Sequence, residues 1–202
     1  TTEIYTLSLH DALPILRAFR RNPAFVAGTL ILVFFVLVAI FADLISPYDP
    51  QDLVAQPAMW PGEDLAYPLG TDSLGRDVLT NLIHGTRASL LVGISAAAIG
   101  LAIGMIVGSL AGFFGGWVDT FLMRLVELFQ TTPTFLLVIV ILAIAAPTLE
   151  TIALAIGLAA WPTVARLVRA QFRSLRESDF VMAARSLGYS RLRIILQEIL
   201  PN

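Results

Sequence analysis

The segment Ala88–Phe113 reads ASLLVGISAAAIGLAIGMIVGSLAGF. It carries no charge, and a helix needs about 20 apolar residues to cross the hydrocarbon core of a bilayer. Its glycines recur at every fourth position, at Gly100, Gly104, Gly108 and Gly112. Helices in lipid associate through close contact over small residues. We therefore expect a membrane span that packs inside a bundle, with a pathway-lining role as the alternative.

Three other apolar stretches have the length of membrane spans, namely 24–45, 118–146 and 151–172. Pro133 predicts a kink in the second of them, because proline lacks the N–H that a helix interior requires. A fifth apolar stretch begins at Ile194 and meets the end of the sequence. The expected fold is all-α: a polytopic transmembrane helix bundle with four spans and the start of a fifth.

Arginines flank the first and the last complete span. They are Arg17, Arg20 and Arg21 before the first, and Arg166, Arg169, Arg173 and Arg176 near the end of the fourth. Basic residues favour the cytoplasmic side, so both flanks are expected there, and an even number of crossings connects them. The acidic, proline-rich segment 46–87 is expected outside. The chain is predicted to be a multi-pass plasma-membrane protein of a bacterium or archaeon, with its N-terminus in the cytoplasm.

The composition excludes several kinds of chemistry. Hydrophobic residues make up 57% of the chain, mean hydropathy is +0.81, and neither lysine nor cysteine occurs. Without lysine the chain has no phosphate-binding GxxxxGK[ST] loop and no Schiff-base site, and without cysteine it has no thiolate nucleophile. The net charge of −2 gives no reason to expect a nucleic-acid partner. Ser95 and Ser109 have no evident base, so we expect no enzyme, no metal site and no cofactor in this chain.

Pro68–Asp77, PLGTDSLGRD, reads as a tight turn within the acidic segment. Asp72 can accept a backbone N–H two residues on, and Gly70 and Gly75 permit positive φ. Arg76 is expected to pair with Asp72 or Asp77. The spacing alone favours a structural loop over a binding site. The candidate residues are Gly70, Thr71, Asp72, Gly75, Arg76 and Asp77.

Residues 178–202 read as two short helices joined by a glycine. Ser178 is the expected N-cap of the first helix, and Gly188 is its expected left-handed end. Ser190 is expected to cap a second helix that runs to Pro201. One face of the first helix presents Phe180, Ala183, Ala184 and Leu187. The residues alone leave open an amphipathic helix that lies at the lipid interface.

Two motifs resemble a known family. The spacing of Ala183-Ala184, Gly188 and Leu200-Pro201 resembles the cytoplasmic "EAA" loop of bacterial ABC-importer permeases, although Met182 replaces its acidic first residue. The PLGTDSLGRD turn, followed by Ile83, Gly85, Arg87, Ser89 and Leu90, resembles the dipeptide, oligopeptide and nickel subgroup, of the second-permease or C type.

The resemblance implies a permease subunit that forms the path for peptides, nickel or similar small solutes. Its partners would be two ATPase subunits that hold ATP and Mg, a paralogous permease subunit, a solute-binding protein outside, and the lipid bilayer. The residues implied in ATPase coupling are Phe180, Met182, Ala183, Ala184, Leu187, Gly188, Leu200 and Pro201. The alternative is an ion-driven carrier or channel without an ATPase, although such proteins usually carry ionisable residues in mid-span.

The sequence thus divides into five expected segments. Residues 1–15 fit poorly with the rest and are a non-native leader or a disordered N-terminus. The others are a cytoplasmic start with span one (16–45), an external loop (46–87), spans two to four (88–177), and a coupling loop with the start of span five (178–202). Because the family typically has about six spans, the C-terminus is expected to be cut off.

Overall fold

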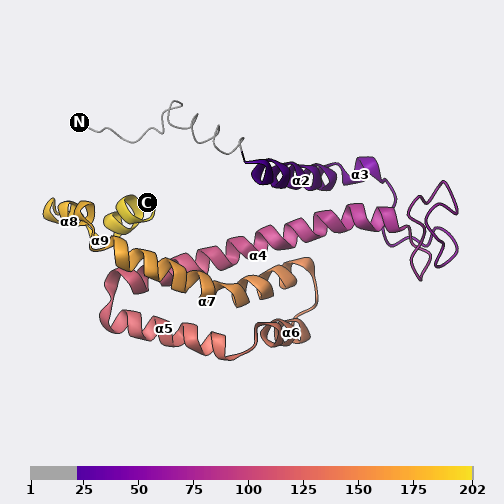
Figure 1. The fold of residues 1–202 in the computed structure, drawn as a ribbon. Coiled ribbons are helices and arrows are strands. Elements are labelled where there is room, and N and C mark those ends of the chain that lie inside the picture. Colours follow the sequence, from indigo (N-terminus) through magenta and orange to yellow (C-terminus); the bar gives the residue numbers. More distant parts are fainter. Residues whose placement is uncertain (1–21, 202) are drawn as a thin grey trace. The chain divides into compact units, whose positions relative to one another are not determined.

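A computed structural model describes residues 22–201 (Figure 1). The expected leader 1–15, the N-terminal arginines Arg17, Arg20 and Arg21, and the last residue lie outside this range. The chain forms two compact units, one up to Leu90 and one from Leu91 onward. The helices are α2 (Pro23–Ile40), α3 (Ala42–Ile45), α4 (Val78–Phe114), α5 (Gly116–Thr131), α6 (Thr134–Ile144), α7 (Leu149–Leu175), α8 (Asp179–Ser186), α9 (Arg191–Arg193) and the π-helical η1 (Ile194–Ile199).

In the first unit, the predicted span 24–45 is interrupted near its end. Asn22 caps α2, with its Oδ1 accepting the N–H of Ala24 at 3.1 Å, and Pro23 occupies the first turn, where its missing N–H has no consequence. Phe41 leaves the helical conformation at φ −94°, ψ 15°, and the short α3 follows it.

Helix α4 begins ten residues before the predicted span, so the segment that precedes it ends at Asp77 and not at Arg87. The cause is a cap: the Asp77 carboxylate accepts the N–H groups of Leu79 and Thr80 at 3.2 and 3.0 Å. The first turns of α4 contact α2 and α3 through Arg87, which pairs with Asp43 at 2.9 Å and donates to the Ala39 carbonyl at 2.8 Å. His84 Nε2 donates to the Ser46 carbonyl at 3.0 Å.

In the second unit, the glycines of α4 lie directly against α7. A Cβ added at Gly100 would lie 3.3 Å from the Gly157 carbonyl oxygen, and one at Gly112 would lie 2.7 Å from that of Arg169. Gly104 faces Val164, and Gly108 faces Ala165 and Val168, in the same register. Residues further along α4 therefore contact residues further along α7, which means that the two helices run parallel. Gly157, which the sequence analysis did not single out, supplies the matching small residue on α7.

The expected kink at Pro133 is a sharp break. Helices α5 and α6 are bent by 82° relative to each other. Thr132 is extended at ψ 127°, as expected before a proline, and Pro133 itself has ψ 129°. At 1.5 Å per residue, α5 is about 24 Å long and α6 about 16 Å, so only together do they reach the thickness of a bilayer.

The bent pair nevertheless carries the chain from one end of α7 to the other. Near its start, Asp119 binds Arg169. Further along, Phe129 stacks edge-to-face on Trp161 at 5.2 Å. Helix α6 packs on α7 and ends just before Thr148, which caps α7. A return across the membrane is what two parallel neighbours require.

Residues 22–201 contain three helices that are long and apolar enough to cross a membrane, α2, α4 and α7. There are four crossings if the α5–α6 pair is counted as one. The described part of the chain has no β-strand, only an isolated bridge between Thr71 and Asp77. The predicted all-α, polytopic class is confirmed.

The α4–α7 contact predicts opposite effects of one substitution at two glycines. Gly108→Ala places a Cβ 2.5 Å from the Ala165 carbonyl oxygen, so the helices must separate, and we expect a loss of about 1–3 kcal/mol of stability. Gly93→Ala meets no atom within 4 Å and should be neutral or slightly stabilising, because alanine favours helix. Thermal unfolding in detergent measures both. Equal melting temperatures for the two variants would contradict the close contact.

Candidate functional site

The candidate coupling helix, α8, has one buried and one exposed face. Val181 and Ala184 are buried, at 0% and 4% exposure. Phe180, Met182 and Leu187 are exposed, at 38%, 51% and 73%, and Ala183 is exposed as well. The predicted apolar face is therefore divided: Ala184 points into the protein, whereas Phe180, Ala183 and Leu187 remain outside.

A hydrophobic cluster supports α8 from beneath. It joins the ends of α4 and α7 to α8 and η1, and its buried members are Phe113, Phe172, Val181, Ala184, Ile194, Ile195 and Ile199. A fully buried aliphatic side chain contributes about 1.5–3 kcal/mol. The cluster therefore fixes α8 on the ends of the two long helices.

Gly188 ends α8 in the left-handed conformation, with φ +77°. The N–H of Gly188 donates to the Arg185 carbonyl at 3.0 Å, and the N–H of Tyr189 donates to that of Ala184 at 3.1 Å. These two bonds form a Schellman motif, which satisfies carbonyls that the helix end leaves free. No atom lies within 4 Å of a Cβ added at Gly188, so backbone strain alone would oppose a larger residue.

Two details of this segment differ from the sequence prediction. Ser178 does not cap α8 with its side chain, because its Oγ donates instead to the Leu175 carbonyl. The second helix, capped by Ser190 at 3.4 Å from the Arg193 nitrogen, widens into the π-helical η1 before Leu200 and Pro201. The Leu200 N–H accordingly reaches back five residues, to the Ile195 carbonyl at 3.0 Å.

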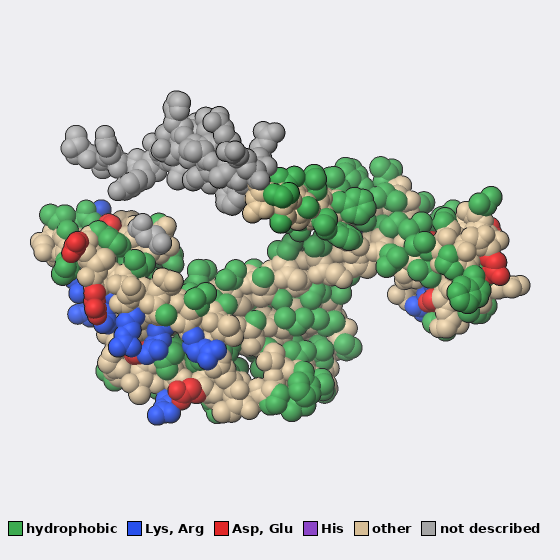
Figure 2. Space-filling model, viewed as in Figure 1, with side chains coloured by type: hydrophobic (Ala, Val, Ile, Leu, Met, Phe, Trp, Pro, Cys, Tyr) green, Lys and Arg blue, Asp and Glu red, His purple; other side chains and the backbone are tan. Residues whose placement is uncertain are grey.

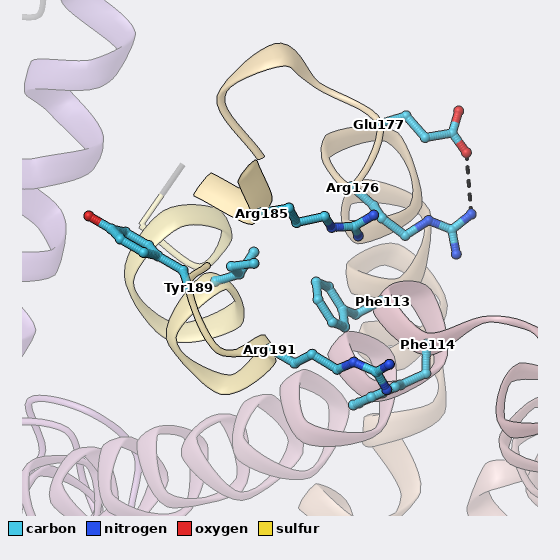
Figure 3. Close-up of a pocket in the computed structure, with 8 residues that line it drawn as sticks. Phe113, Phe114, Arg176, Glu177, Arg185, Tyr189 and Arg191 are labelled. Atoms are coloured by element: carbon cyan, nitrogen blue, oxygen red, sulfur yellow. Dashed lines mark hydrogen bonds and ion pairs between the residues drawn. The ribbon is translucent and has the colours of Figure 1, made fainter. Parts of the chain in front are cut away.

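A basic pocket of about 670 Å³ lies beside α8 (Figure 3). Figure 3 shows Arg176, Arg185 and Arg191 extending around the rings of Phe113 and Phe114. Glu177, Tyr189 and Ile194 complete its lining. Figure 2 shows basic side chains gathered over the end of α7 and α8. Arg185 and Arg191 gave no signal of a site in the sequence, because the pocket forms only where α4, α7, α8 and α9 meet.

A second, polar pocket of about 360 Å³ lies at the break between α5 and α6. Gln130 and Thr134 approach from the two sides of the break, and Thr163 and Arg166 from α7. Thr163 lies nine residues before Phe172 on α7. This places the polar pocket about 13 Å along the helix from the hydrophobic cluster that supports α8. All four of these polar side chains are exposed, so the pocket opens on the surface of the unit, beside the irregular backbone of the break.

Arg169, which the sequence placed only in the basic flank of the fourth span, is paired within the unit. Its Nη2 lies 2.6 Å from Asp119 Oδ2, and its Nε bonds the other carboxylate oxygen. Such a two-point guanidinium–carboxylate contact fixes geometry as well as charge. The 50-residue separation of the partners left no local signal in the sequence. Arg124 and Glu127 form an exposed ion pair on α5 at 2.8 Å.

The motif Pro68–Asp77 holds together the segment that precedes it. Thr71 Oγ1 accepts the Met59 N–H at 3.0 Å and donates to the Gln56 carbonyl. Gly70 and Gly75 have φ of +71° and +87°, and a Cβ on either would collide with a carbonyl, of Met59 or Ala55.

Asp72 makes the expected backbone contacts, but Arg76 does not pair with it. Asp72 Oδ1 accepts the N–H groups of Leu74 and Arg76 at 2.8 and 2.9 Å. Arg76 Nε is buried, and the described residues offer it no hydrogen-bond partner. Within residues 22–201, no group of acidic or histidine side chains is arranged to hold a metal ion.

Protonation of Asp72 should loosen this motif. The backbone N–H of Arg76, assisted by that of Leu74, holds the pKa of the Asp72 carboxyl below its usual value of 3.8. A lowered pKa means that the stabilisation is complete above about pH 4 and is lost as the pH falls through the folded value. We expect protection of the Leu74 and Arg76 amides from hydrogen exchange to be constant from neutral pH down to that limit and then to decrease. Asp72→Asn should reduce protection at neutral pH, and Asp52→Asn should not. Equal protection in the two variants would contradict the role of this carboxylate.

Comparison with known proteins identifies the family. Residues 100–202 match the family described as "Binding-protein-dependent transport system inner membrane component", and residues 14–61 match the "N-terminal TM domain of oligopeptide transport permease C".

Curated relatives agree with both matches. The dipeptide transport system permease protein DppC of Haemophilus influenzae is 34% identical over 189 residues, which cover 91% of this chain and 64% of the relative. The di/tripeptide transport system permease protein DppC of Pseudomonas aeruginosa is 37% identical (92% and 63% covered). The glutathione transport system permease protein GsiD of Escherichia coli is 36% identical (92% and 61%). The chain spans less than two thirds of the length of these relatives. With half of its residues matched by one family and apolar helices throughout, this chain belongs to the inner-membrane components of binding-protein-dependent transport systems.

Proposed function

We propose that the chain forms part of the membrane-spanning permease subunit of an ATP-driven importer of peptides or similar small solutes. The observation that carries the proposal is α8, a short helix with an exposed apolar face, fixed by its own core to the ends of α4 and α7. Family membership and relatives named for dipeptide, di/tripeptide and glutathione transport support the solute class. The subunit would itself catalyse no reaction, and nickel stays a possible solute on the sequence resemblance alone.

The exposed face of α8 is suited to a groove on a separate ATPase. Phe180, Ala183 and Leu187 recur at helical spacing, which is how amphipathic helices bind apolar grooves. ATP and Mg would be bound by two such ATPase subunits, because this chain has no lysine for a phosphate-binding loop. A paralogous permease subunit and an external solute-binding protein would complete the assembly. Since the supporting core includes the ends of two long helices, motion of α8 would be passed directly to them.

We place α8 on the cytoplasmic side. The arginines near the end of α7 favour that side for its C-terminus, and the parallel course of α4 and α7 gives both helices the same direction. The N-terminus of the chain would then also lie in the cytoplasm, and the segment from Ser46 to Asp77 would face the solute-binding protein.

The polar pocket at the α5–α6 break is our candidate for part of the solute path. Discontinuous helices often line transport sites, because their free backbone groups and polar side chains face a cavity. Gln130, Thr134, Thr163 and Arg166 line this one. Arg166 could attract the carboxylate of a peptide, and the described residues offer it no ion-pair partner.

Removing the apolar face of α8 should release the ATPase. We expect Phe180→Ala with Leu187→Ala to abolish co-purification of an ATPase subunit, since truncating a central interface residue costs about 1 kcal/mol or more. Ser186→Ala, on the same helix, is the matched control. A bulky substitution such as Ala184→Arg would not test this docking face, because Ala184 is buried in the protein's own core. Undiminished co-purification by the double variant would refute this docking face. Uptake that needs only an ion gradient would instead favour a carrier.

Replacing Gly188 should separate ATP hydrolysis from transport. Valine is strained at φ +77°, whereas asparagine tolerates that conformation. Gly188→Val is therefore expected to reduce solute uptake per ATP hydrolysed, and Gly188→Asn to retain most of it. Reconstituted vesicles allow both rates to be measured. Normal coupling in the valine variant would show that the left-handed turn is not required.

Arg166 allows a test of the solute path. Arg166→Gln should raise KM for a dipeptide with a free carboxylate by about tenfold, the usual loss of a charge-assisted hydrogen bond. It should leave KM for the amidated dipeptide nearly unchanged. Arg124→Gln, at an exposed surface pair, is the control. Equal changes for both peptides would remove Arg166 from solute recognition.

A further inference from the structure

The basic pocket beside α8 combines cationic and apolar walls. The Arg185 guanidinium carbon lies 5.6 Å from the centroid of the Phe113 ring, and that of Arg191 lies 5.9 Å from the centroid of Phe114. The two rings pack edge-to-face at 5.3 Å. Each guanidinium is thus held against an aromatic face, with its N–H groups available to a ligand (Figure 3).

Positive charge dominates the pocket. Arg176, Arg185 and Arg191 line it together with a single carboxylate, that of Glu177. Glu177 binds Arg176 at 3.2 Å. Among residues 22–201, neither Arg185 nor Arg191 has an ion-pair partner. Two guanidiniums around one cavity form a ready site for an anion, and the fork of an arginine fits the oxygens of a phosphate.

The pocket also lies where apolar helices meet water. Phe113 and Phe114 end α4, which carries no charge from Ala88 onward. Arg176 follows directly after α7. The pocket is therefore at the end of the apolar part of α4, where lipid headgroups are expected. Basic pockets at this level between membrane helices are a known setting for anionic headgroups.

From these observations we propose that the pocket binds the phosphate of an anionic phospholipid, with Arg185 and Arg191 as its ligands and Phe113 and Phe114 beside the start of the acyl chains. A volume of about 670 Å³ exceeds what a single acidic side chain of a partner protein would fill. The proposal does not depend on the transport function or on the orientation of the chain.

Lipid binding to the protein purified in a mild detergent provides the test. Native mass spectrometry would measure the affinities for phosphatidylglycerol and for zwitterionic phosphatidylcholine, and we expect a clear preference for the former. Arg185→Gln and Arg191→Gln should each weaken phosphatidylglycerol binding by about tenfold, the loss of one hydrogen bond to a charged group. Arg173→Gln is the matched control, because Arg173 is exposed on α7 and does not line the pocket; its effect should stay within about threefold.

A variant that binds phosphatidylglycerol more tightly would distinguish loss of a specific ligand contact from general damage to the fold. Glu177→Gln removes the one carboxylate of the pocket and should tighten phosphatidylglycerol binding, which a disordered site would not do. The proposal is overturned if Arg185→Gln and Arg191→Gln bind phosphatidylglycerol like the control. It is also overturned if inorganic phosphate alone binds with the same dependence on these arginines, because the ligand is then a soluble phosphate. Loss of a co-purified protein with unchanged lipid binding would reassign the pocket to a protein partner.

Discussion

Close contact between α4 and α7 is the constraint on which the second unit depends. The glycines of α4 and Gly157 of α7 bring two backbones within van der Waals distance over several turns, which replaces the hydrophobic drive that is missing in lipid. The same contact sets the two helices parallel and brings Phe113 and Phe172 together at one end. Without that platform, a helix as short as α8 would have nothing to fold against, because isolated helices of this length are unstable in water.

The parallel course of α4 and α7 determines what α5 and α6 must do. Two neighbouring parallel helices need a return between them, and the chain provides it as a broken pair, not as one straight helix. The Asp119–Arg169 ion pair anchors the beginning of the return, and Phe129 on Trp161 holds it before the break. The break leaves polar side chains around a pocket that opens on the surface of the unit. The break at Pro133 thus makes the connection between α4 and α7 a candidate part of the solute path as well.

Helix α8 has two sides with different chemistry. Its exposed residues Phe180 and Leu187 can bind an apolar groove, whereas Arg185 lines the basic pocket. An ATPase and a lipid phosphate would therefore contact the same short helix without competing for one surface. Both partners would contact residues that pack on the same hydrophobic cluster. Bound lipid would therefore strengthen the attachment of α8 to α4 and α7 while the ATPase moves it.

The class of this protein, its apolar helices, the glycine stripe and the left-handed end at Gly188 could all be predicted from the sequence. These features depend on composition, on spacing along one helix or on the conformational freedom of a single residue, and all of that is local information. Packing determined that Ala184 points inward, that Arg169 pairs with Asp119 and that Arg185 and Arg191 share a pocket. Each of these outcomes depends on which of several available partners a side chain meets, and that choice is made only when segments far apart in the chain are packed together.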